Sequence, residues 1–196
     1  FGKVSISNIE ESIKSNNSII VMPDMGNIDP IVKNKLIKWI KKGGVLIRFA
    51  GPRLANSSTN LLPIKINNSE ARHLGGTLTW ESPLAFDDFD ENSIFYGLKT
   101  SEEVKIKKQI LGEPIYNNSN FTWARLKDGT PIVSGSKNDQ GWIVLFHTSA
   151  NNQWSNLPIS ELFLSMLSRL TMLGKNYNQN LYNELLPLKV LMSSSQ

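Results

Sequence analysis

The sequence predicts an α/β domain with a parallel core, an antiparallel β-hairpin extension and a closing helix. Residues 18–50 contain an apolar run, an amphipathic run and a second apolar run, which is the order of a β-α-β unit with parallel strands. Residues 121–147 contain short apolar runs separated by Asp-Gly at 128–129 and Asn-Asp-Gln-Gly at 138–141, which are typical of hairpin turns. A chain of 196 residues is long enough for one such domain.

The parallel core is predicted by two apolar strands, "SIIVMP" and "VLIRFAG", and by the helix between them. Asp29 is a suitable N-cap for this helix, Pro30 occupies its first position and Gly43 ends it. Before the first strand, residues 3–6 are expected to form a short strand and residues 9–13 a helical turn or two. One face of the helix is expected to be buried, because apolar residues repeat there at helical spacing, opposite the lysines. These apolar residues are Val32, Leu36, Ile37 and Ile40.

The second half of the chain is predicted to be antiparallel β structure followed by a helix. The runs "LGGTLTWE" and "EVKIKKQIL" indicate two further strands. Asn156 and Pro158 are expected to open the closing helix, which ends at Gly174. We therefore predict one domain over residues 1–174, with residues 175–196 forming a connector and the start of a following module.

Composition excludes several classes of function. The chain has no cysteine, which excludes thiol catalysis, disulfides and zinc-thiolate sites. Lys+Arg exceeds Asp+Glu by 21 to 17, but the arginines are spread from Arg48 to Arg169 rather than gathered on one stripe, so nucleic-acid binding is not predicted. No apolar run is long enough to span a membrane. Because the chain begins at Phe1, we expect it to be a segment of a larger protein.

The order of these elements resembles that of class I glutamine amidotransferase-like domains. In that family a nucleophilic cysteine follows a strand, in a position that "GGVLIRFAGPR" resembles, and a histidine follows a late strand that "VLFHTSA" resembles. Over residues 18–173 the sequence looks like the amidotransferase-like region of bacterial BatA-like (aerotolerance-type) membrane proteins, with "RFAGPRLA" and "WSNLPIS" as the most specific stretches. The resemblance implies a flavodoxin-like parallel core.

The catalytic pattern of that family is broken in this sequence. The position of the cysteine nucleophile falls at Phe49 or Ala50, and neither side chain is a nucleophile. His147 stands where the family histidine stands, but the following acid position is Ser149. Acyl transfer needs a nucleophile, a base and a group that orients the base, so two of the three are missing. The resemblance therefore implies a scaffold that has lost amidotransferase activity.

The other candidate residues have structural as well as functional interpretations. Arg48 lies within an apolar strand, where an unpaired charge is costly, so we expect an ion pair with Asp24. Trp154 is expected to pack against the closing helix, with a place in a cleft beside His147 as the alternative. The acidic residues at 87–91 offer oxygen ligands but lack the pattern of a calcium-binding loop, so a solvated loop is expected and no metal or cofactor is predicted.

The predicted function is that of a non-catalytic interaction module in a larger, membrane-anchored protein of the bacterial cell envelope. The expected partners are proteins of a membrane assembly, membrane attachment is expected through segments outside this chain, and the expected location is periplasmic. Residues 52–60 and 82–96 are predicted to form recognition loops, because they are long for connectors.

Two alternatives remain open. One is a carbohydrate-binding domain resembling trehalose-utilisation-like proteins, in which Trp80, Trp123 and Trp154 would stack on sugar rings. The other is a Ser/His hydrolase that uses His147 with one of three serines of the neighbouring sequence. None of these serines lies in the Gly-x-Ser-x-Gly turn that such enzymes use; they are Ser134, Ser136 and Ser149.

Overall fold

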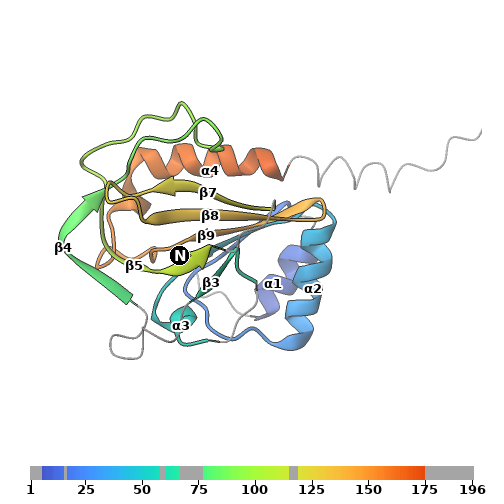
Figure 1. Cartoon of the computed structure of the whole chain (residues 1–196). Coiled ribbons are helices and arrows are strands. Elements are labelled where there is room, and N and C mark those ends of the chain that lie inside the picture. The colour runs from blue at the N-terminus through green and yellow to red at the C-terminus, as the bar shows by residue number, and fades with distance from the viewer. Residues whose placement is uncertain (1–5, 16, 58–60, 67–76, 115–118, 175–196) are drawn as a thin grey trace, which may run out of the picture.

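A mixed five-stranded sheet forms the centre of the molecule (Figure 1). The computed structural model describes residues 6–15, 17–57, 61–66, 77–114 and 119–174. The strand order is β1-β2-β9-β8-β7, in which β1, β2 and β9 are parallel and the β8–β9 and β7–β8 pairs are antiparallel. The strands are β1 (Ile19–Met22), β2 (Val45–Phe49), β7 (Asn120–Arg125), β8 (Pro131–Asn138) and β9 (Gly141–Phe146). The predicted α/β class is confirmed, with a parallel core three strands wide.

The helix of the β-α-β unit is α2 (Pro30–Lys41), and its predicted caps are confirmed. The Asp29 carboxylate accepts hydrogen bonds from the backbone N–H groups of Ile31 (2.8 Å) and Val32 (3.3 Å). Gly43, just beyond the helix end, has a φ of 112°, which favours glycine. The helical turn expected near residue 9 is a full helix, α1 (Ile6–Lys14), so Ile6 opens a helix rather than ending a strand, and residues 3–5 lie outside the described part.

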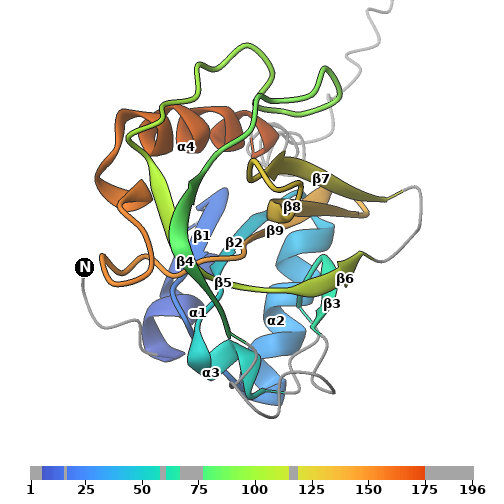
Figure 2. The ribbon, with the colours of Figure 1, turned by 60° about the vertical axis from the view of Figure 1, so that its left-hand side comes forward.

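The closing helix lies on the face of the sheet opposite to α1 and α2, and it begins later than predicted (Figure 2). Asn156 precedes a short 3-10 helix, η2 (Leu157–Ile159), and α4 (Glu161–Leu173) follows it. Ser160 is the N-cap of α4, because its hydroxyl accepts a hydrogen bond from the Phe163 N–H (3.2 Å).

Two smaller antiparallel sheets extend the central one. In the larger of them, β4 (Thr77–Ala85) pairs with β5 (Lys105–Ile110). In the other, β3 (Ile64–Ile66) pairs with β6 (Gly112–Pro114). The two predicted recognition loops are therefore shorter than expected, since α3 (Pro52–Ala55) occupies the start of one and β4 continues to Ala85 in the other.

The hydrophobic core is divided between the two faces of the sheet. The face under α4 buries a phenylalanine-rich cluster that includes Phe49, Phe146 and Phe163. The opposite face packs against α1 and α2 through residues such as Leu36 and Leu46. A third, smaller cluster of buried residues lies where the parallel strands end. It fills the region in which the candidate site is predicted.

Candidate functional site

The carboxyl ends of the parallel strands bring the candidate residues to one edge of the sheet. Met22 pairs with Arg48 in the register of β1 and β2, and Phe49 pairs with Phe146 in the register of β2 and β9. Because β2 lies between β1 and β9, the segment that follows β2 lies between the ends of the other two strands. Ala50 therefore lies between the end of β1 and His147, as expected if Phe49 or Ala50 stands at the nucleophile position.

The nucleophile position of the amidotransferase pattern is occupied by buried hydrocarbon. Phe49 stacks on Phe146, with ring centroids 4.9 Å apart, and meets Phe163 edge-on at 5.9 Å. Ala50 is fully buried, and its N–H donates to the Phe146 carbonyl (2.8 Å). Neither position presents a reactive atom to solvent.

Asp24 caps a helix instead of pairing with Arg48. Its carboxylate accepts hydrogen bonds from the N–H groups of Arg53 (3.1 Å) and Leu54 (2.9 Å), at the start of α3. Gly51 permits this approach, since a Cβ there would lie 2.4 Å from the Asp24 carboxyl carbon. The predicted ion pair is therefore wrong: the free N–H groups at the start of α3 bind the carboxylate.

Arg48 is fully buried and donates to backbone oxygen atoms. Its Nη2 donates to the Met25 carbonyl (2.6 Å) and its Nη1 to the Leu61 carbonyl (3.4 Å). Burial lowers the pKa of Arg48 to about 10, and the charge of Asp24 opposes this change. The guanidinium remains charged at neutral pH and holds the segments after β1 and β2 in place.

His147 is buried, and both of its ring nitrogens are hydrogen bonded. The side chain is 1% exposed, its Nδ1 lies 3.2 Å from the Ile110 carbonyl oxygen, and its Nε2 lies 2.9 Å from the Ser134 hydroxyl. A carbonyl oxygen only accepts, so Nδ1 carries the hydrogen and Nε2 accepts from the Ser134 O–H. Burial lowers the pKa of His147 to about 4, against the opposing effect of the Ile110 hydrogen bond, so the ring is neutral at pH 7.

Trp154 is buried as predicted, but not against the closing helix. It is 6% exposed and belongs to the cluster at the strand ends, with Ala50, Leu54 and Leu145. Its carbonyl oxygen accepts hydrogen bonds from two successive N–H groups of β5. Residues 147–156 thus pair with β5 before the chain reaches α4, and Trp154 shares its cluster with Leu54 and Ala55 of α3.

The remaining candidates are half-buried or exposed. Ser149 is half-buried beside Thr148, whose hydroxyl donates to the Lys108 carbonyl (2.9 Å). Asp88 accepts a hydrogen bond from the Thr100 hydroxyl (3.1 Å), in the exposed acidic loop. Within the described ranges, no group of three or more His, Cys, Asp or Glu residues could hold a metal ion.

Of the three serines considered for the hydrolase alternative, Ser134 is the one whose hydroxyl contacts His147. Together with His147 it forms a serine–histidine hydrogen bond, as in a hydrolase, with the Ile110 carbonyl in place of the orienting acid. Ser134 is only 2% exposed, so neither member of the pair is open to a substrate. The hairpin register offered a signal, because Ser134 lies opposite Leu145, two residues before His147 on the same face.

Comparison with known proteins identifies the fold but no family. No family model and no curated protein matches the chain. A cytoplasmic protein of Salmonella typhimurium is similar, with a TM-score of 0.63 and 12% identity, over 86% of this chain and 74% of that chain. A second cytoplasmic protein of that species has a TM-score of 0.57 and 12% identity, over 90% and 87%.

A ThuA-like protein from Bacteroides uniformis is also similar, with a TM-score of 0.56 and 14% identity, over 88% of this chain and 75% of that chain. At such identities the similarity concerns the α/β fold alone. In the described ranges of the chain, no helix has both the length and the apolar character needed to cross a membrane.

Proposed function

We propose that this chain is a catalytically silent amidotransferase-like module that acts by binding a protein partner. The observation that carries the proposal is the buried chain of hydrogen bonds from Ser134 through His147 to Ile110, which occupies both nitrogens of the only described histidine. The surrounding residues also support the absence of catalysis, because Ala50 stands at the nucleophile position and the Trp154 cluster fills the adjacent space. The chain also has no cysteine.

The proposed setting is a larger membrane-anchored protein of the bacterial cell envelope, with this module on the periplasmic side. Its support is the resemblance of residues 18–173 to the amidotransferase-like region of BatA-like proteins. Fractionation of cells that express the native gene, followed by immunodetection, tests the setting. Recovery with membranes is expected, whereas recovery in the cytosol would overturn the setting without bearing on the absence of catalysis.

Turnover assays test the absence of catalysis. The purified protein, Ser134→Ala and His147→Ala are assayed for glutamine hydrolysis and for hydrolysis of a p-nitrophenyl ester. We expect no turnover above the buffer rate, because Ser134 and His147 are both buried. Turnover that both substitutions abolish would instead identify the chain as a serine hydrolase.

Carbohydrate binding is the second candidate, and a partly exposed pair of aromatic side chains favours it. The predicted stacking residues Trp123 and Trp154 are only 5% and 6% exposed, so that part of the prediction is wrong. Phe121 is 39% exposed, and its ring centroid lies 5.7 Å from that of the half-buried Trp142. Saccharide binding on a glycan array that disappears in Phe121→Ala would favour this function over a protein-binding module.

A further inference from the structure

A second candidate site lies away from the strand ends, between residues 101–104 and the start of α4. A pocket of about 380 Å³ opens there, a size typical of small-ligand sites. Its apolar lining includes Val104, Ile159 and Leu162, and its acidic lining consists of Glu103 and Glu161. None of the candidate residues at the strand ends lines this pocket.

The neutral polar groups of the pocket are already engaged within the protein. The Asn156 side chain accepts from the Lys105 N–H (2.7 Å) and donates to the Glu103 carbonyl (2.7 Å). The Ser160 hydroxyl donates to the Leu157 carbonyl (2.7 Å). The Asn156 contacts fix the two walls of the pocket relative to each other. The carboxylates are left as its main open polar groups.

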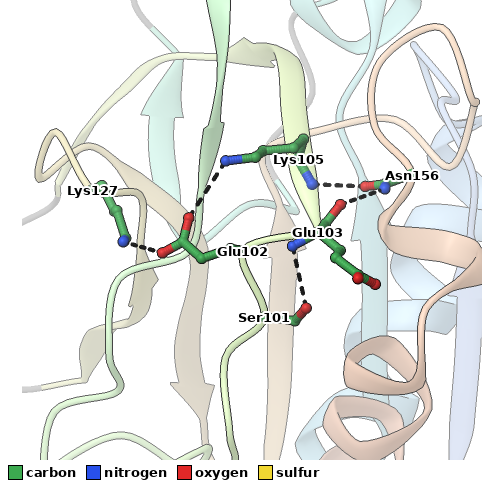
Figure 3. A network of polar contacts seen from close by, with 6 residues as sticks. All are labelled: Ser101, Glu102, Glu103, Lys105, Lys127 and Asn156. Atoms are coloured by element: carbon green, nitrogen blue, oxygen red, sulfur yellow. Dashed lines mark hydrogen bonds and ion pairs between the residues drawn. The ribbon is translucent and has the colours of Figure 1, made fainter.

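The nearby lysines do not neutralise the pocket carboxylates. Lys105 and Lys127 both form ion pairs with Glu102, while the Glu103 carboxylate points away from that network (Figure 3). Neither Glu103 nor Glu161 has an ion pair with another described residue. Glu161 also lies in the first turn of α4, where the helix dipole stabilises a negative charge.

Apolar surface borders the same pocket. Ile159 is 76% exposed and Leu164 is 67% exposed, which makes them the most exposed large hydrophobic side chains in the described ranges. Leu164 follows Glu161 by three residues and therefore lies on the same side of α4. Exposed apolar side chains next to a pocket are typical of a surface that a protein partner covers.

We propose that this pocket binds a lysine or arginine side chain of the protein partner. The aliphatic stem of that side chain packs on Val104 and Leu162, and its cationic group lies near Glu103 and Glu161. Apolar residues beside it in the partner cover Ile159 and Leu164. This inference rests on the proposed binding function and names the surface and the chemistry of the partner.

Titration of the isotope-labelled chain with capped amino acids, followed by amide NMR, tests the proposal. The probes are N-acetyl-lysine N-methylamide and N-acetyl-arginine N-methylamide, with N-acetyl-norleucine N-methylamide as the uncharged control. We expect millimolar binding of the charged probes, with shifts confined to residues 101–104 and 156–164. Glu103→Gln and Glu161→Gln should each weaken binding about two- to fivefold, a range typical of exposed ion pairs. Glu91→Gln, in the exposed acidic loop, is the matched control and should change nothing.

Several results would overturn the proposal. Equal binding of the norleucine probe, or unchanged binding in both glutamine variants, would show that the carboxylates do not select the ligand. Salt provides a check independent of folding, because 0.5 M NaCl should weaken the lysine probe and not the norleucine probe. Binding of 1,5-diaminopentane as tight as that of the capped lysine would identify a free amine as the ligand instead of a partner side chain. Each result is distinguishable from a failure of the proposed absence of catalysis, which the turnover assays decide.

Discussion

Protonation of His147 should destabilise the protein in mild acid. The pKa of this residue is about 4 in the folded chain, against 6.5 as its ordinary value. Well above pH 6.5 the ring is neutral in both states and contributes no pH dependence. As the pH falls from 6.5 to 4, the unfolded chain takes up a proton that the folded chain does not, so stability falls across this window. At pH 4.5 the loss from this group amounts to about 2.5 kcal/mol.

Urea unfolding at pH 7.0 and pH 4.5 measures this loss, with His147→Gln as the control. Glutamine does not titrate, so the variant keeps the pH dependence of every other group and loses only that of residue 147. The native protein should lose about 2.5 kcal/mol more between the two pH values than the variant does. Equal losses in the two proteins would refute the burial of an uncharged imidazole. A ring titration near pH 6.5 by NMR would do the same.

Three further substitutions test the packing of the site by urea unfolding. Asp24→Ala should cost about 1–2 kcal/mol, because α3 loses its cap, and a cost near zero would contradict the capping role. Trp154→Ala should cost about 3–5 kcal/mol as a buried aromatic, and a cost below ~1 kcal/mol would indicate an exposed indole. Gly135→Ala should cost about 1–3 kcal/mol, because its Cβ would lie 2.4 Å from the Trp123 ring, with altered tryptophan fluorescence as an independent check.

Local signals explain the elements that the sequence predicts well. Asp29, Pro30 and the residues after Lys41 mark the ends of α2 through capping groups only a few residues away. The hairpin between β8 and β9 was likewise marked by its turn residues, and Asp139 adopts a φ of 53° there. Such features follow from backbone geometry within one turn of the chain.

The errors arise from contacts between residues far apart in the sequence. The sequence favours a pair of Asp24 with Arg48 because both adjoin strand ends, but the N–H groups that bind Asp24 belong to α3, roughly 30 residues later. Trp154 was assigned to α4 because it precedes that helix. Its packing is instead decided by β5, whose N–H groups bond its carbonyl, and the sequence carries no local sign of that pairing.

Part of the candidate site can be predicted from the sequence. The β-α-β pattern and the late strand placed Ala50 and His147 at one edge of the sheet, since parallel strands end together. Predicting that the Ser134 hydroxyl contacts His147 also requires the antiparallel register of β8 and β9. Whether the pair was accessible depended on the cluster around Trp154, which only the folded chain brings together.

Labelling with a fluorophosphonate most directly tests the claim that the Ser134–His147 pair is structural. The reagent forms a covalent adduct with a serine that an accessible histidine activates, and intact-mass analysis of the folded protein detects it. The account predicts no adduct on Ser134, because the hydroxyl and the ring are both buried and the lowered pKa of the His147 ring makes it a weak base. A stoichiometric adduct on Ser134 that is absent in His147→Ala would contradict the account and show an open active site.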